Sequence, residues 1–247
     1  MAKSEVNCKV ALVTGASKRI GNGIARKFHE EGYNIVLHYN MSSKDALFLA
    51  EELNKKRENS CFPIQFDLGN FHEYENFKDQ LGDDWKKINV LINNASTFYP
   101  TPIDDISEDH WEKLIGSNLK GPMFLIKGLK QKLKESNGSI INITDTNLSK
   151  GVANYSIYSA AKAGLEAITK GLARELAPEI KVNAIAPGAM LEPPDVTWTE
   201  EQKNKVIDTI PLKRMGSEKD IAEAVKFLAN SDYITGQIIK VDGGRSL

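Results

Sequence analysis

The chain has 247 residues, of which 41% are hydrophobic and 26% are charged, and its formal net charge at pH 7 is −1. This balance argues against a dedicated nucleic-acid or membrane-surface binder. No apolar run approaches the length of a bilayer span, the N-terminus lacks the apolar stretch of a signal peptide, and the cysteines and histidines show no metal-ligand spacing. We therefore expect a cytoplasmic protein without a structural metal, built as a single domain over residues 1–247.

Short apolar segments alternate with amphipathic stretches along the whole chain. The apolar segments lie at residues 9–14, 34–39, 63–67, 90–93, 139–144, 181–186 and 237–241. Valine- and isoleucine-rich runs without clean alternation are typical of parallel strands that are covered on both faces. The stretches between them carry helix signals, such as the capping-box spacing of Ser217 and Asp220 and a stop at Gly32. The pattern predicts a Rossmann-type, doubly wound α/β fold, with seven parallel strands and helices on both faces.

A glycine-containing loop follows the first predicted strand, with the sequence Gly-Ala-Ser-Lys-Arg-Ile-Gly at residues 15–21. A backbone that approaches a pyrophosphate needs residues without a Cβ atom, and the following helix points N–H groups at the phosphates. Many similar turns bind nothing, but the strand before this loop and the helix after it favour a dinucleotide site. The predicted contacts are Gly15, Ser17, Lys18, Arg19, Ile20 and Gly21.

The end of the second predicted strand indicates which nicotinamide dinucleotide binds. A carboxylate there would hydrogen-bond the adenosine ribose and repel a 2′-phosphate. Residues 37–43 contain no carboxylate, and Asn40 and Ser42 can donate hydrogen bonds to a phosphate. Lys18 and Arg19 bring positive charge, unless they are simply solvated loop residues. We therefore expect NADPH.

Tyr158 and Lys162 lie one helical turn apart, and Tyr158 stands thirteen residues after Asp145. A phenol with its ordinary pKa near 10 exchanges protons poorly at neutral pH, and a neighbouring ammonium favours the phenolate and lowers that pKa. The same lysine can hydrogen-bond a nicotinamide ribose. A Tyr-x-x-x-Lys spacing is common by chance, so its significance depends on the other motifs around it.

Taken in order, these motifs resemble the short-chain dehydrogenase/reductase family, and the resemblance extends over residues 9–247. It includes Asn-Asn-Ala-Ser at residues 93–96 and Val-Asn-Ala-Ile-Ala-Pro-Gly at residues 182–188. The resemblance implies that Tyr158 and Lys162 are catalytic and contact the cofactor. It places Asn118 in a proton relay at a helix kink, although an asparagine within a helix is also an ordinary polar spacer. The further cofactor contacts that it implies are His38, Tyr39, Asp67, Leu68, Asn94, Ala95, Ser96, Pro187 and Gly188.

Several segments are similar to one subgroup of that family, the pteridine reductases. They include the basic loop, the sequence Ser-Thr-Phe-Tyr-Pro at residues 96–100, and Asp145 in the place of the family's usual serine. The resemblance implies that the pteridine stacks on Phe98. It also implies that Ser96 binds the polar edge of the pteridine and that Arg19 contacts both cofactor and substrate. Asp145 and Tyr158 would contact the substrate as well. Trp198 would lie on a lid of about residues 189–211, and the chain would form a homotetramer through helices near residues 111–134 and 158–175 and through the C-terminal tail.

Asp145 suits such a substrate because a pterin ring nitrogen needs a proton when the adjacent carbon is reduced. A simpler interpretation of Asp145 is a strand-end aspartate that caps the following turn. A simpler interpretation of Phe98 is a residue of the hydrophobic core. We expect NADPH-dependent reduction of pteridines such as dihydrobiopterin, dihydromonapterin or dihydrofolate. One alternative is a carbonyl reductase such as a 3-oxoacyl-carrier-protein reductase, which the missing serine disfavours. Another is a non-catalytic NADPH-binding sensor or scaffold, which has no chemical need of Tyr158 and Lys162.

Overall fold

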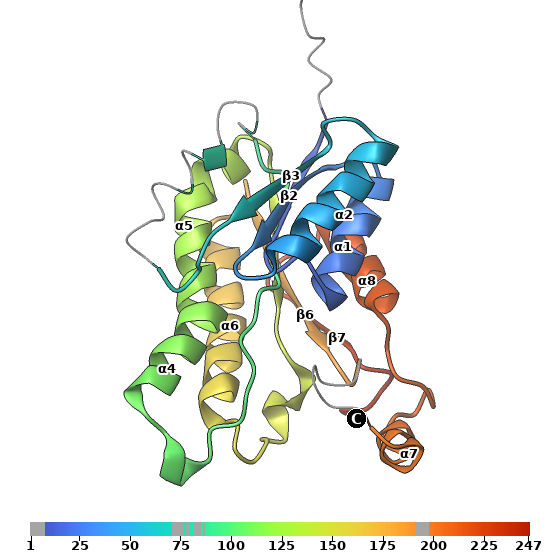
Figure 1. Ribbon diagram of the computed structural model, residues 1–247. Coiled ribbons are helices and arrows are strands. Elements are labelled where there is room, and N and C mark those ends of the chain that lie inside the picture. Colours follow the sequence, from blue (N-terminus) through green and yellow to red (C-terminus); the bar gives the residue numbers. More distant parts are fainter. Residues whose placement is uncertain (1–7, 71–76, 78–79, 82–84, 86, 191–197) are drawn as a thin grey trace, which may run out of the picture.

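The computed structural model describes residues 8–70, 77, 80–81, 85, 87–190 and 198–247 (Figure 1). A single seven-stranded sheet with the order β3-β2-β1-β4-β5-β6-β7 forms the centre, and its neighbouring strands are parallel. The strands are β1 Val10–Val13, β2 Asn34–Tyr39, β3 Cys61–Gln65, β4 Val90–Asn93, β5 Ser139–Ile143, β6 Lys181–Pro187 and β7 Ile238–Val241. This arrangement confirms the predicted Rossmann-type α/β class.

Helices cover both faces of this sheet (Figure 1). One side carries α1 Arg19–Glu30, α2 Ser43–Lys56 and α8 Glu218–Asn230. The other side carries α4 Glu108–Ile115, the π-helical segment η4 Gly116–Lys120, α5 Gly121–Lys134 and α6 Ser156–Glu175. Two short 3-10 helices, η3 Ile103–Asp105 and η5 Thr146–Ser149, and helix α7 Glu200–Asp208 lie in the connections. In the described parts of the chain, no helix has the length and apolarity needed to cross a membrane.

Strand β1 shows why the apolar segments lack alternation. Ala11 and Val13 pack in the core cluster that includes side chains of α1, α2 and α8, and Leu12 packs in the cluster that includes those of α5 and α6. Because successive side chains of a strand point to opposite faces, a strand covered on both sides is apolar at every position. The sequence of the strand therefore already indicates that helices cover both of its faces.

Strand β3 begins at Cys61, two residues before the predicted start at Pro63. A proline has no N–H group to donate to a neighbouring strand, so it is unfavourable inside a strand that is paired on both sides. β3 is the edge strand of the sheet, where the missing N–H group faces no further strand. Pro63 therefore lies inside β3, opposite Leu37 of β2.

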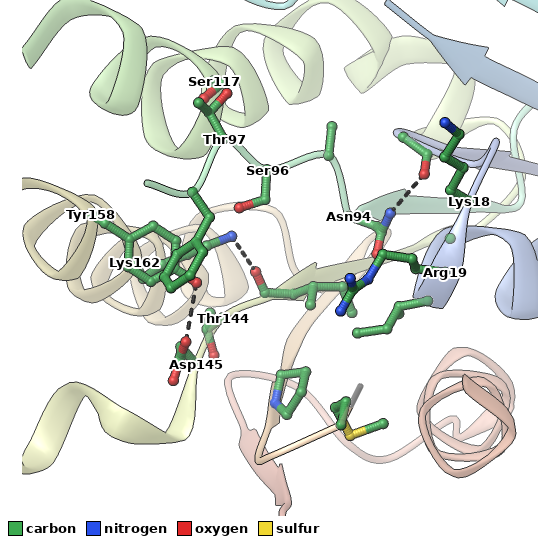
Figure 2. A pocket seen from close by; sticks show the side chains of 18 of the residues that line it. Lys18, Arg19, Asn94, Ser96, Thr97, Ser117, Thr144, Asp145, Tyr158 and Lys162 are labelled. Atoms are coloured by element: carbon green, nitrogen blue, oxygen red, sulfur yellow. Dashed lines mark hydrogen bonds between the residues drawn. The ribbon is translucent and has the colours of Figure 1, made fainter. Parts of the chain in front are cut away.

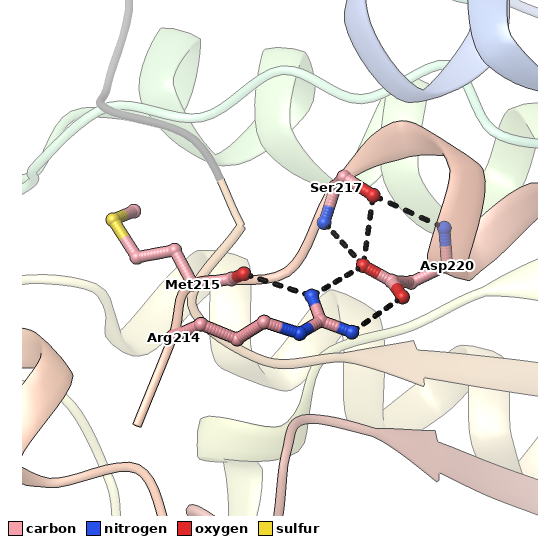
Figure 3. A network of polar contacts seen from close by, with 4 residues as sticks. All are labelled: Arg214, Met215, Ser217 and Asp220. Atoms are coloured by element: carbon pink, nitrogen blue, oxygen red, sulfur yellow. Dashed lines mark hydrogen bonds and ion pairs between the residues drawn. The ribbon is translucent and has the colours of Figure 1, made fainter. Parts of the chain in front are cut away.

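The capping box predicted at the start of α8 is present and is reinforced by an arginine (Figure 3). Ser217 Oγ accepts a hydrogen bond from Asp220 N at 3.4 Å, and Asp220 Oδ2 accepts one from Ser217 N at 2.7 Å. Arg214 donates to both carboxylate oxygens of Asp220 at 2.8 Å. This guanidinium, together with the Ser217 hydrogen bonds, holds the pKa of Asp220 well below its usual range despite partial burial. The network anchors α8, which packs against α1 and so supports the helix that follows the glycine loop.

The order of the strands places a crevice at the carboxyl end of the sheet. The chain runs from β1 to β2 and β3 on one side, and then to β4, β5, β6 and β7 on the other. In doubly wound sheets, ligands bind beyond the carboxyl ends of the strands where the strand order reverses. The predicted motifs all follow strand ends on this edge, after β1, β2, β4, β5 and β6.

Candidate active site

A cavity of about 1250 Å³ lies at this edge and extends from the glycine loop to α6 and the end of β6. That volume exceeds the usual range for one small ligand, so it suits a dinucleotide together with a second molecule. Every residue predicted for cofactor or substrate contact lines it: Gly15, Ser17, Lys18, Arg19, Ile20, Gly21, His38, Tyr39, Asn40, Ser42, Asp67, Leu68, Asn94, Ala95, Ser96, Phe98, Asp145, Tyr158, Lys162, Pro187, Gly188 and Trp198. Asn118 lies behind this lining, where its Oδ1 accepts a hydrogen bond from Ser96 Oγ at 2.7 Å.

Two glycines of the loop occupy places that no larger residue fits. A Cβ atom on Gly21 would lie 2.2 Å from the carbonyl oxygen of Gly15, and one on Gly15 would lie 2.9 Å from the Cα atom of Ala95. Asn94 Nδ2 donates to the carbonyl oxygens of Thr14 and Gly15, at 2.8 and 3.1 Å, and so fixes the loop. The loop is therefore a tight backbone cradle at the start of α1, as phosphate binding requires.

Arg19 stands in this loop where the related pattern usually has a glycine. Its φ is 51°, in the left-handed region that favours glycine over residues with a Cβ atom. The side chain lies beside Asn94 and faces into the cavity (Figure 2). The loop therefore keeps the backbone conformation of a glycine while it carries a guanidinium, which fits the predicted contact with anionic ligand groups.

His38 connects the glycine loop to the segment that follows β3. Its Nδ1 accepts a hydrogen bond from Gly15 N at 3.2 Å, and its Nε2–H donates to Phe66 O at 2.9 Å. Burial lowers the pKa of this imidazole to about 4. A neutral His38 with its proton on Nε2 thus holds the loop in place, in addition to the predicted contact with the cofactor.

We expect the free energy of unfolding to fall as the pH drops from about 6.5 to about 4. In this window the unfolded His38 binds a proton and the folded one does not, so acid favours the unfolded chain. A pKa difference between 6.5 and about 4 corresponds to roughly 3 kcal/mol over the whole window. Urea titrations of the wild type and of His38→Asn at several pH values measure it. The carboxylates and His29 contribute equally to the pH dependence of both proteins, so the difference between the two isolates His38. Equal pH slopes in both proteins would contradict a neutral, buried His38.

Lys18 forms an ion pair that the sequence did not reveal. Its Nζ lies 3.1 Å from Asp45 Oδ2 in the first turn of α2, and both side chains are about half exposed. Asp45 lies two residues after the carboxylate-free segment of residues 37–43. Part of the positive charge predicted for a 2′-phosphate is therefore neutralised within the chain.

Asp145 uses its two carboxylate oxygens for two different contacts. Oδ2 accepts a hydrogen bond from Tyr158 Oη at 3.1 Å (Figure 2), and Oδ1 accepts one from Asn147 N at 2.7 Å at the start of η5. The turn-capping interpretation and the placement beside the phenol are thus both correct. The second oxygen faces the phenol inside the cavity, which a simple cap does not require.

Lys162 is buried, and its ammonium is bound by a backbone carbonyl group. Nζ donates to Ile143 O at 2.9 Å and lies 5.8 Å from the centroid of the Tyr158 ring (Figure 2). Burial lowers the pKa of Lys162 to about 8, and the Asp145 carboxylate partly opposes that shift. Burial and Asp145 raise the pKa of Tyr158 above its ordinary value. The net shift of the phenol's pKa is therefore opposite to the predicted one, and the role of Tyr158 as a proton donor stays a prediction.

Phe98 is half exposed at 51% and lines the cavity, so it does not belong to the core. Its ring stacks on Tyr155 with the centroids 4.6 Å apart and an interplanar angle of 15°. Its edge contact with Tyr158 has a centroid distance of 4.8 Å. Two tyrosines thus hold an aromatic ring in a fixed orientation beside the phenol and Asp145.

The helix kink expected at Asn118 is present as the π-helical segment η4, between α4 and α5. Asn118 is fully buried, and its Nδ2 donates to Thr97 O at 2.8 Å and to Leu114 O at 2.9 Å. Short π-helical segments often accompany functional sites. The proton-relay role of Asn118 stays a prediction. In the predicted lid, Trp198 and α7 are described, whereas residues 191–197 lie outside the described residues.

Comparisons with known proteins agree with this geometry. A family model described as "Enoyl-(Acyl carrier protein) reductase" matches residues 15–246. Pteridine reductase 1 of Leishmania tarentolae is 37% identical, with 96% of each chain covered. The 3-oxoacyl-[acyl-carrier-protein] reductase of Staphylococcus epidermidis is 38% identical and covers 96% of this chain and 98% of its own. The chain belongs to the short-chain dehydrogenase/reductase family. The corresponding enzyme of Buchnera aphidicola is 32% identical, also with 96% of each chain covered.

Reductases of this family use nicotinamide cofactors, and the residues of this oxidoreductase fit one. The cradle of Gly15 and Gly21 at the start of α1 would hold the pyrophosphate, and Tyr158 and Lys162 would lie at the nicotinamide end. The cofactor supplies the reducing equivalent when it is bound. The chain itself would supply the proton donors and the shape of the substrate site beside it.

Proposed function

We propose that this reductase uses NADPH to reduce pteridines, converting dihydropterins to tetrahydropterins. One observation carries the proposal. Asp145 stands where the family usually has a serine, and its carboxylate meets the Tyr158 hydroxyl at 3.1 Å within the cavity. A carboxyl group is a poor holder of a carbonyl oxygen but a suitable proton donor to a ring nitrogen.

The proposed chemistry follows from what each side chain offers. The C=N bond of a dihydropterin gains a proton on nitrogen as its carbon is reduced, and Asp145 delivers that proton. The hydroxyl of Tyr158 donates a hydrogen bond to the Asp145 carboxylate, so the proton that Asp145 delivers comes from the phenol, and solvent water reprotonates the phenol afterwards. Phe98 offers the ring on which a pteridine stacks, a contact that contributes on the order of 1 kcal/mol.

The second candidate is reduction of a 3-oxoacyl thioester. It is favoured by the staphylococcal relative, which is as similar to this chain as the Leishmania pteridine reductase. Tyr158 could serve a carbonyl oxygen directly, but no serine hydroxyl stands at position 145 to help hold it. A non-catalytic NADPH sensor is the third candidate. NADPH oxidation assayed with dihydrobiopterin and with an acetoacetyl thioester separates the three, since a sensor oxidises NADPH with neither.

We expect NADPH to bind more tightly than NADH, because Asn40 and Ser42 line the cavity after β2, where residues 37–43 carry no carboxylate, and Arg19 of the glycine loop adds a positive charge to the same cavity. Asp45→Asn should widen this preference, because it frees Lys18 from its ion pair and removes a negative charge. Fluorescence titration of both cofactors with the wild type and the variant measures the ratio of dissociation constants. Equal constants in the wild type would refute the NADPH assignment.

We also propose a homotetramer, although fewer apolar side chains are available for its interfaces than the sequence suggested. Leu125, Ala161 and Leu165 of the predicted interface helices are buried within the chain. Trp111 and Phe124 on the same helices, 48% and 37% exposed, remain as an apolar surface for a second copy. Light scattering gives the mass, and a monomeric mass would exclude this assembly.

A further inference from the structure

A small polar recess of about 160 Å³ lies beside the large cavity. Its lining consists of Thr146, Asn147, Lys150, Thr209, Arg245 and Ser246. These residues come from η5, from the end of α7 and from the C-terminal tail, so the fold gathers three distant segments around one space. A water molecule occupies about 30 Å³ of liquid volume, so the recess is large enough for a small group such as a phosphate or a carboxylate.

The recess carries two positive charges that are not paired with carboxylates. Lys150 Nζ donates to the carbonyl oxygen of Arg245 at 2.9 Å, and Arg245 Nε donates to Thr209 Oγ1 at 3.1 Å. Both partners are neutral oxygens, and throughout the described residues neither cation forms an ion pair. Two cations among hydroxyl groups form a typical environment for a phosphate or carboxylate.

The recess is continuous with the proposed substrate site. Asn147 and Arg245 line both the recess and the large cavity. The backbone N–H of Asn147 is also the group that binds Asp145 Oδ1 at 2.7 Å. A molecule held beside Asp145 therefore has the recess within reach of a short substituent.

We propose that the recess binds the anionic end of a substrate side chain, a phosphate or a carboxylate carried by the pteridine. The inference rests on the proposed pteridine reduction and specifies which pteridines the site prefers. The guanidinium of Arg245 contacts the anion, and Lys150 holds the tail in place and adds a second positive charge. A neutral side chain gains nothing from either cation, so the recess separates charged from uncharged pteridines.

The test compares three substrates in the wild-type enzyme: dihydroneopterin, its monophosphate, and dihydrofolate. We expect a lower KM for an anionic substrate than for neutral dihydroneopterin. A preference for the monophosphate identifies a phosphate as the ligand group, and a preference for dihydrofolate identifies a carboxylate. In Arg245→Gln, the KM of the preferred anionic substrate should rise about tenfold with little change in kcat, while the values for dihydroneopterin stay the same. Arg245→Lys should recover part of the loss.

Lys56→Gln is the matched control, because it removes one positive charge from the exposed end of α2 and should leave every KM unchanged. Equal KM values for charged and neutral pteridines in the wild type, or an equal rise for both in Arg245→Gln, would overturn the inference. If the wild type reduced no dihydropterin, the proposed function would fail separately. Equilibrium titration with dihydroneopterin and its monophosphate would then test whether the recess binds an anionic group. Tighter binding of the monophosphate would support this role of the recess, and equal binding would refute it.

Discussion

Asp145→Asn should abolish the reduction of dihydropterins, with kcat falling by about 10²-fold or more. Asparagine keeps the size of the side chain and an oxygen that accepts the Asn147 N–H group, so the turn at η5 should persist. It carries no proton of suitable acidity to give to a ring nitrogen. Steady-state NADPH oxidation with dihydrobiopterin measures the loss, and NADPH titration should show an unchanged dissociation constant.

Asp145→Ser is the companion to that variant. It should also fail with dihydropterins, but it restores the hydroxyl that the family usually has and should gain slight activity on a simple ketone. Phe98→Ala distinguishes binding from proton transfer, because loss of the stacked ring should chiefly raise the KM for the pterin. Full pterin turnover by Asp145→Asn would return Asp145 to the role of a turn cap.

Tyr158→Phe should reduce turnover by about 10²- to 10⁴-fold while NADPH binding stays nearly intact. The substitution removes only the hydroxyl that contacts Asp145, and the edge contact of the ring with Phe98 remains. Lys162→Ala should damage both turnover and cofactor binding, because it removes a buried ammonium from the cavity and leaves Ile143 O without its donor. The kcat values and the NADPH dissociation constants of both variants test this, in preparations whose melting temperatures match the wild type.

Tyr155→Phe is the matched control for the loss of a phenol. Tyr155 stacks on Phe98 one turn before Tyr158, but it does not line the cavity. Its replacement keeps the stacked ring and should leave kcat unchanged. If Tyr158→Phe were as active as Tyr155→Phe, Asp145 alone would supply the proton and the role of the Tyr158 hydroxyl would be wrong.

The fold could be predicted because its signals are local. A parallel strand covered on both faces is apolar at every position, as β1 is, and the helix boundaries carry their own residues, such as the Ser217 and Asp220 box. The main boundary error concerned Pro63. A proline is tolerated inside β3 because β3 is the edge strand, and the position of a strand at the edge is a property of the whole sheet and not of the segment.

The lining of the cavity could also be predicted, because each motif follows a strand and the carboxyl ends of parallel strands meet at one edge. The contacts within the site could not. The ion pair of Lys18 with Asp45 joins two segments that carry no mutual signal, and the same holds for Lys150 and Arg245, which are 95 positions apart. The direction of the pKa shift of Tyr158 follows from its burial and from the Asp145 carboxylate, neither of which the four-residue spacing of Tyr158 and Lys162 specifies.

The most direct test of the pteridine assignment is the ratio of kcat/KM for dihydrobiopterin to kcat/KM for an acetoacetyl thioester, measured in one preparation of the wild-type enzyme with NADPH. The position of Asp145 beside Tyr158 predicts a ratio far above one, and a ratio that collapses in Asp145→Asn. A wild-type enzyme that ignored dihydrobiopterin and reduced the thioester, with Asp145→Asn making no difference, would contradict the assignment and establish a carbonyl reductase.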